Sequence, residues 1–159
     1  MYQKREQEAI GLLTDAAAID GQSATTWLYL GLASQRLGRD AEARKAFQKG
    51  LTVAEHEVVH VPRSGLFHAR LAYFCAQTGQ TDRAGMEAAQ AVQLAPNHND
   101  TLWMTTLTYE HIGNRAAALK TLQSAPRSLL EDLRRWPEAS ALTSDGGFSQ
   151  LLPAPGGQH

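Results

Sequence analysis

The chain has 159 residues, the size of one ordinary domain, and its fifteen basic and sixteen acidic residues leave a formal charge of −1. This balance gives no electrostatic case for binding nucleic acid, and no run approaches the ~20 apolar residues that a membrane-spanning helix needs. The single cysteine, Cys75, excludes an internal disulfide and favours a reducing compartment. We therefore expect a cytoplasmic protein that neither binds nucleic acid nor inserts into a membrane.

The composition favours helices along the whole chain. Alanine, leucine, glutamine, glutamate and arginine dominate, and these residues lose little free energy on entering a helix. Apolar residues recur at helical spacing, as at Leu30, Ala33 and Leu37. The N-terminal stretch MYQKREQEAI is charged and lacks the apolar segment of a secretory signal. The sequence therefore predicts an all-α fold.

Three turn segments share one pattern: RLGRDAEARKAF, QTGQTDRAGMEAA and HIGNRAAALKTL. In each, a glycine is followed five residues later by an alanine, and another apolar residue comes four positions after that. Glycine ends a helix in the left-handed conformation, and the small alanine lets the next helix pack closely on the first. The pattern predicts one helix–turn–helix unit used three times, with Ala84 and Ala118 at close helix contacts.

A catalytic motif lies between the first two units. The stretch from His56 to His60, HEVVH, fits H-E-x-x-H, which places two zinc-binding histidines on one helix face with a catalytic glutamate, Glu57, between them. A zinc hydrolase also needs a third protein ligand, and the extended form of the motif would require glycine and histidine where Arg63 and Leu66 stand. We expect a solvated helix end and no metal or other cofactor, with a zinc-dependent hydrolase as the alternative.

The first unit resembles the tetratricopeptide repeat, a helical hairpin with the pattern W-x2-L-G-x2-Y, then A-x3-F, then P. The matching residues of this unit are Trp27, Leu30, Gly31, Ala43 and Phe47, with Ser34 at the tyrosine position. The later units match at alanine and apolar positions, and Tyr109 fills the tyrosine position of the third, while Cys75 replaces it in the second. The resemblance implies a right-handed superhelical stack of antiparallel helix pairs that works as a non-enzymatic protein-binding scaffold.

The glycine spacing predicts the organisation of the chain. From Gly79 to Gly113 is 34 residues, the length of the repeat, but from Gly38 to Gly79 is 41. The seven extra residues extend the second helix of the first unit to about His60. The expected order is a partial first repeat (2–20), three repeats (24–60, 65–96 and 99–125), capping helices (126–152) and a disordered tail (153–159).

The C-terminal segment contains two short amphipathic stretches, which read as the cap of a solenoid. It also resembles the closing region that follows tetratricopeptide repeats in many bacterial serine/threonine kinases, although Gly146 replaces a proline of that pattern. The matching residues are Asp145, Phe148, Leu151 and Leu152. The stretch from Glu131 to Trp136 is interpreted as a solvated helix face, with a basic contact patch as the alternative.

The resemblance implies that the first helix of each unit lines a concave groove for an extended peptide or a helix of a partner protein. The groove residues that it implies are Leu28, Tyr29, Leu32, Arg36, Arg70, Tyr73, Gln77, Trp103, Met104, Leu107 and His111. Tyr73 and Trp103 are the expected anchors, because large aromatic side chains contribute most at interface centres. The alternative is that some of these residues pack against the next repeat or the cap.

Overall fold

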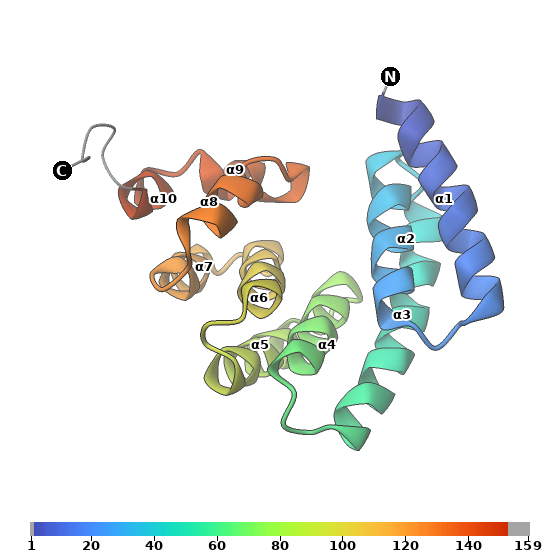
Figure 1. The fold of residues 1–159 in the computed structure, drawn as a ribbon, viewed down its shortest axis with the longest axis horizontal. Helices are drawn as coiled ribbons and strands as arrows, with labels where there is room; N and C mark the ends of the chain where they lie inside the picture. Colours follow the sequence, from blue (N-terminus) through green and yellow to red (C-terminus); the bar gives the residue numbers. More distant parts are fainter. Residues whose placement is uncertain (1, 153–159) are drawn as a thin grey trace.

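The structure is a computed structural model that describes residues 2–152. Its first seven helices form an antiparallel array (Figure 1): α1 (Tyr2–Ile19), α2 (Ala24–Arg36), α3 (Asp40–His60), α4 (Gly65–Gln77), α5 (Thr81–Leu94), α6 (Asn99–His111) and α7 (Arg115–Leu122). The part of the chain that is described contains no strand, so the predicted all-α stack of helix pairs is confirmed. The predicted disordered tail, 153–159, lies outside the described residues.

The three hairpins share one turn, as the glycine pattern predicted. Gly38, Gly79 and Gly113 have φ values of 69°, 83° and 79°, which side chains other than glycine rarely adopt. The residue after each glycine donates its backbone N–H to the carbonyl five residues earlier, for example Arg39 to Ser34 at 2.9 Å. This bond closes the helix end. The alanine that follows five residues after each glycine is buried in all three hairpins.

Side chains also fix where the first helix of each hairpin begins. Ser23 and Ser64 accept hydrogen bonds from the backbone N–H groups of Thr26 and Phe67, each at 3.2 Å. These bonds satisfy amide groups that have no partner inside the helix. The second helix of the first hairpin, α3, continues to His60, as the seven extra residues predicted.

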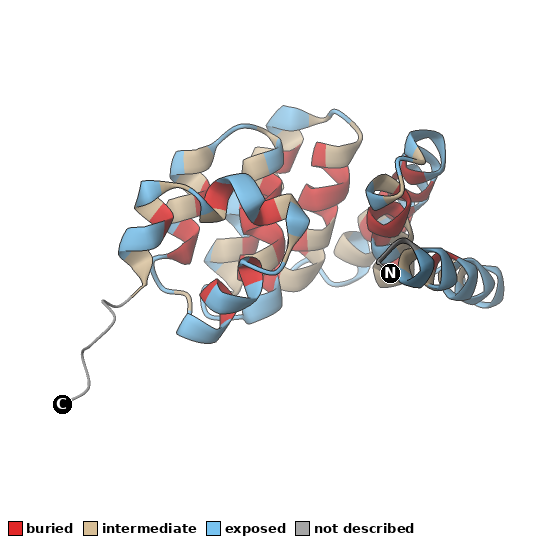
Figure 2. Cartoon of the chain, turned by 90° about the horizontal axis from the view of Figure 1, so that it is seen from above, coloured by how far each residue is buried: buried red, intermediate tan, exposed pale blue. Residues whose placement is uncertain are grey.

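The hairpins are not evenly stacked. Helices α4 and α6 lie side by side, and α5 packs against both. By contrast, α2 packs closely on α1 and α3 but not on α4, and the extended α3 carries the chain from the first hairpin to the second. The helices near the N-terminus are accordingly set apart from the rest of the molecule (Figure 2). A concave space lies between α2 on one side and α4 and α6 on the other, where residues of all three helices line shared hollows.

The C-terminal segment folds over the end of the array (Figure 1). It consists of α8 (Arg127–Leu133), a 3-10 helix η1 (Pro137–Ala139), α9 (Ser140–Thr143) and α10 (Gly146–Leu151). Its apolar residues are buried, among them Leu129, Leu130, Leu133, Leu142 and Phe148. Within residues 2–152 no helix is long and apolar enough to cross a membrane.

Candidate functional site

The concave space is lined by α2, α4, α6 and residues 134–139, which we call the strap. Strap residues border two separate hollows. The first, which we call the aromatic hollow, has a volume of about 410 Å³ and is lined by Tyr29, Asn99, Asp100, Trp103, Leu129, Asp132, Arg135 and Trp136. The second, the polar hollow, has a volume of about 330 Å³ and is lined by Gln35, Tyr73, Gln77, Leu107, Glu110, His111, Arg115, Glu138 and Ala141.

The aromatic hollow combines three large rings with unpaired hydrogen-bonding capacity. Tyr29 is 42% exposed. The rings of Trp103 and Trp136 meet edge to face with their centroids 4.6 Å apart. The Nε1–H of Trp103 is buried and finds no acceptor within residues 2–152. A buried donor without an acceptor is costly. The hollow is therefore suited to an apolar side chain, and the enclosed N–H becomes available to an acceptor only when the rings around it move.

A smaller hollow of about 100 Å³ extends this surface towards α4. It shares Tyr29 and Trp103 with the aromatic hollow and adds Arg70 at its edge and Leu28 and Met104 in its lining. Arg70 is held in place by the carboxylate of Glu57, with Nη1–Oε1 at 3.1 Å. The open part of the concave face thus runs from α2 across the start of α4 to α6.

The strap reaches α2 through Arg36. The guanidinium of Arg36 donates two hydrogen bonds to the carboxylate of Glu138, at 2.8 and 3.0 Å, and its centre lies 5.0 Å from the centroid of the Trp136 ring. The hydrogen bond that Arg36 donates to Glu138 is the main reason why the pKa of Arg36 is raised. Glu6 of α1 adds a longer contact at 3.4 Å. The fork geometry makes this a specific carboxylate site.

In the polar hollow, α2 and α4 are joined by amide side chains. Gln35 donates to Gln77 at 2.9 Å, and Gln77 donates to the hydroxyl of Tyr73 at 3.0 Å. Burial, and then the nearby Glu138 carboxylate, raise the pKa of the Tyr73 hydroxyl, so it stays protonated. Burial also lowers the pKa of His111. The polar hollow is therefore bordered by a chain of hydrogen bonds that links α2 to α4.

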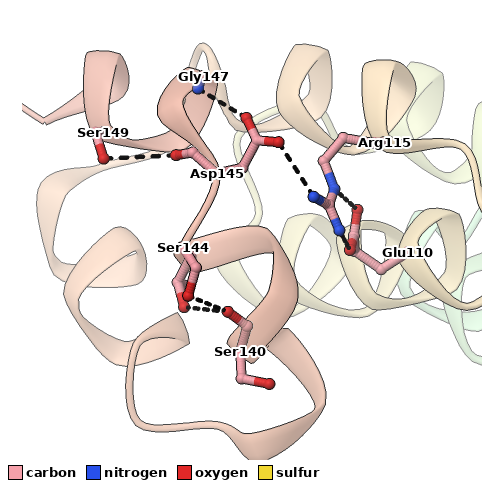
Figure 3. Close-up of polar contacts among 8 residues, drawn as sticks. Glu110, Arg115, Ser140, Ser144, Asp145, Gly147 and Ser149 are labelled. Atoms are coloured by element: carbon pink, nitrogen blue, oxygen red, sulfur yellow. Dashed lines mark hydrogen bonds and ion pairs between the residues drawn. The ribbon is translucent and has the colours of Figure 1, made fainter.

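A second ion-pair site fixes the far end of the C-terminal segment (Figure 3). Arg115 donates two hydrogen bonds to Glu110, at 2.8 and 2.7 Å, and a third to Asp145 at 3.1 Å. Asp145 also accepts the backbone N–H of Gly147 at 2.7 Å, and so caps α10. The N–H of Gly147 and then Arg115 lower the pKa of Asp145. This site ties α10 to α6 and α7.

The structure separates the predicted groove residues into two sets. Six are exposed or partly exposed: Tyr29, Arg36, Arg70, Gln77, Trp103 and His111. Five are buried and form the floor: Leu28, Leu32, Tyr73, Met104 and Leu107. These five side chains are enclosed by neighbouring parts of the fold, which is the alternative stated for the groove residues.

Tyr73 differs most from the expectation of a solvent-facing anchor. It is 1% exposed, and its ring lies edge to face with Phe47 at 6.1 Å and with Phe74 at 6.5 Å. Its hydroxyl lines the polar hollow beside Glu138. The ring is enclosed because α3 and α6 both pack against α4. Trp103 is partly exposed and packs against the core and the Trp136 ring.

The HEVVH stretch forms the exposed end of α3. The rings of His56 and His60 lie 3.9 Å apart, and Nδ1 of His60 contacts the carbonyl oxygen of His56 at 2.9 Å. Glu57, the catalytic residue of the alternative function, binds Arg70 instead. Among residues 2–152, no group of three or more histidine, cysteine, aspartate or glutamate side chains is arranged to hold a metal ion. Nothing in this geometry supports the hydrolase.

A histidine–carboxylate pair appears where the sequence showed none. Nδ1 of His68 lies 2.6 Å from Oε2 of Glu87, and its Nε2 lies 2.9 Å from the carbonyl oxygen of Pro62. Both ring nitrogens are therefore engaged, and the pair fixes the α3–α4 connection rather than offering a free base. Cys75 is buried, as predicted, and burial raises the pKa of its thiol to about 11. Its thiolate is therefore scarce near neutral pH.

The strap residues Trp136 and Glu138 were not identified as site residues from the sequence. The interpretation of Glu131–Trp136 as one solvated helix face is wrong at its end, because α8 stops at Leu133 and Trp136 packs on Trp103. Pro137 was the available signal, since the residue before a proline is disfavoured in a helix. Trp136 is extended, with φ −94° and ψ 120°.

The fold and this groove define a helical-repeat protein with a partly closed concave face. The family model of the tetratricopeptide repeat matches residues 24–57, which comprise α2 and most of α3. This match supports a tetratricopeptide repeat protein, and such repeats generally mediate protein–protein interactions. A comparison with curated proteins finds no match.

Proposed function

We propose that this chain binds a peptide or helix of a partner protein in its concave groove, at the aromatic hollow. The observation that carries the proposal is the pairing of an exposed Tyr29 with Trp103, whose buried indole N–H has no acceptor within residues 2–152. Aromatic side chains in a partly enclosed surface are the usual centres of protein interfaces. Arg70 and Asp100 at the edge supply charged groups of both signs.

The groove residues proposed to touch the partner are the six that are not fully buried. The five buried residues act indirectly, by setting the shape of the floor. Tyr29 and Trp103 are the proposed anchors, because each presents a large ring to the same hollow. Arg70 is proposed to orient the partner by its charge, while Glu57 holds the guanidinium in position.

The proposed setting is the regulatory end of a bacterial signalling protein in the cytoplasm. It is supported by the likeness of the closing region to the segment that follows such repeats in bacterial serine/threonine kinases. Asp145 and Phe148 carry that likeness, and both have structural roles here, Asp145 as the cap of α10 and Phe148 as a buried core residue.

Site-specific photocross-linking tests the proposed surface. A photoreactive phenylalanine analogue replaces Tyr29 in one version of the chain and Met86 in another, and both are expressed in the native cells. Met86 is the matched control, because it is 73% exposed on α5 and lines neither the aromatic nor the polar hollow. We expect a defined cross-linked partner from position 29 only. Equal cross-linking from both positions, or from position 86 alone, would refute the groove.

A further inference from the structure

The groove already contains a peptide of its own chain. The strap enters the concave face with an extended residue, Trp136, and places two different groups on two different helices. The Trp136 ring meets Trp103 of α6, and the Glu138 carboxylate is held by Arg36 of α2. An aromatic residue followed two positions later by a carboxylate is thus the pattern that the groove receives.

We propose that the strap is an internal competitor, and that the partner carries an aromatic residue followed two positions later by an acidic residue, which displaces Trp136 and Glu138 from Trp103 and Arg36. This inference rests on the proposed function and names the chemistry of its partner. In the closed state the strap occupies the carboxylate site, and in the open state the partner does.

The part of the strap that carries Trp136 and Glu138 is proposed to leave, while the completely buried Ala139 and the flanking helices stay in place. On its N-terminal side, α8 is fixed by the buried residues Leu129, Leu130 and Leu133. On its C-terminal side, Phe148 is buried and Asp145 is bound to Arg115. The link to α2, by contrast, is an ion pair whose Arg36 and Glu138 side chains are 27% and 20% exposed. Water and a competing carboxylate can therefore reach it.

The chemistry of Arg36 selects a carboxylate rather than another acceptor. A guanidinium offers two parallel N–H groups that match two carboxylate oxygens, as Glu138 demonstrates. Trp103 provides the second specific feature, an indole N–H that the strap leaves without an acceptor. A partner that satisfied this N–H would hold an advantage over the strap. Because the strap is tethered, it competes at a high effective concentration, and the wild-type chain should bind such a peptide weakly.

The test uses the full chain and a fluorescein-labelled peptide, RRWPEASAL, which copies residues 134–142. Its affinity is measured for the wild-type chain and for Glu138→Gln, whose strap lacks the carboxylate. We expect Glu138→Gln to bind the peptide at least about tenfold more tightly, because its own competitor is weakened. Peptides with alanine in place of tryptophan, or glutamine in place of glutamate, should not compete.

Two further variants assign the effect to the groove. Glu131→Gln removes an exposed carboxylate of the same segment, which pairs with Arg127 and lines neither hollow, and should leave peptide affinity at the wild-type value. Adding Arg36→Gln to Glu138→Gln should abolish the gain in peptide affinity. Equal affinity of wild type and Glu138→Gln, with both folded by circular dichroism, would overturn the proposal. So would concentration-dependent dimerisation of Glu138→Gln that excludes the peptide, because a second copy would then be the occupant.

Hydrogen exchange of the wild-type chain tests the displacement of the strap without any substitution. Saturating the wild-type chain with the peptide should accelerate amide exchange in residues 134–138 and leave α8 and α10 protected. Unchanged exchange in the strap with peptide bound would contradict displacement. The proposed function is judged separately by the cross-linking experiment. If position 29 cross-links a partner but this peptide does not bind, groove binding stands, and only the aromatic–acidic pattern and the competing strap are refuted.

Discussion

Helices α4–α7 are joined through small and fully buried side chains, whereas α2 is joined to α4 and to the strap by polar ones. On the first side, Ala84, Ala88 and Ala91 are completely buried. On the second, the links are Gln35 with Gln77 and Arg36 with Glu138. Close apolar packing tolerates little change in helix spacing, while hydrogen bonds between partly exposed groups can exchange with water.

The joint between the two regions is apolar and lies between α3 and α4. Phe47 of α3 meets both Tyr73 and Phe74 of α4, so the first hairpin is attached to the second through its outer helix. Because polar links between partly exposed groups can exchange with water, we expect α2 to move relative to α4 and the strap more readily than α3 moves relative to α4.

The largest effect is expected in the tightly packed region. Ala84→Leu inserts a larger side chain at a completely buried position and should lower the free energy of unfolding by about 1–3 kcal/mol or more. Thermal melting followed by circular dichroism measures the change. Gly85→Ala is the matched control, because its added Cβ would meet only Ile112 at 3.8 Å, and it should stabilise the helix by about 0.5–1 kcal/mol. A midpoint unchanged by Ala84→Leu would contradict the packing.

A smaller effect on stability, but a larger one on shape, is expected where Arg36 links α2 to the strap. Arg36→Gln should cost at most about 1 kcal/mol, because its ion pair is partly exposed. Small-angle scattering should nevertheless show a larger radius of gyration, since the first hairpin loses its link to the strap. Ionic strength of about 1 M, where charges are screened beyond ~3 Å, should move wild type in the same direction. An identical scattering curve for variant and wild type would argue for a rigid stack.

The ion-pair site at α10 predicts a dependence on pH. The pKa of Asp145 is lower in the folded chain than in the unfolded one, so its contribution to stability is present above the unfolded pKa and is lost as pH falls through the folded pKa. Asp145→Asn should therefore reduce the fall in melting midpoint between neutral and acidic pH. Asp132→Asn is the control, because within residues 2–152 Asp132 pairs only with Arg135, an exposed neighbour on the same segment. The same pH slope in wild type and Asp145→Asn would contradict the assignment.

The smallest effect is expected at the HEVVH stretch. Replacing both His56 and His60 with alanine changes exposed residues at a helix end and should alter the free energy of unfolding by less than about 0.5 kcal/mol. Cross-linking from position 29 should be unaffected. Loss of a stoichiometric bound zinc ion, measured by metal analysis before and after the substitution, would instead revive the hydrolase alternative.

Local features of the fold were predictable from the sequence, because they depend on residues close together in the chain. The three glycine turns, the buried Ala84 and Ala118 and the extension of α3 to His60 all follow from spacing. The inward position of Tyr73 did not, since helical periodicity identifies an apolar face without showing which distant segment will cover it.

The candidate site was harder to predict for the same reason. Its shape depends on how α2 is placed relative to α4 and on a strap that arrives from the other end of the chain. Glu138 meets Arg36 across 102 residues, and His68 meets Glu87 across 19. No spacing rule connects such pairs, and the tetratricopeptide repeat pattern stops before the strap begins.

The contact between Arg36 and Glu138 also has a consequence for the order of folding. Most other contacts in the array join neighbouring helices, so hairpins can form early and add to one another along the chain. The Arg36–Glu138 pair closes a loop that contains nearly the whole array, and it forms only after the intervening hairpins have stacked. We therefore expect this pair to form after the transition state. Arg36→Gln should then accelerate unfolding while leaving the folding rate of the chain almost unchanged.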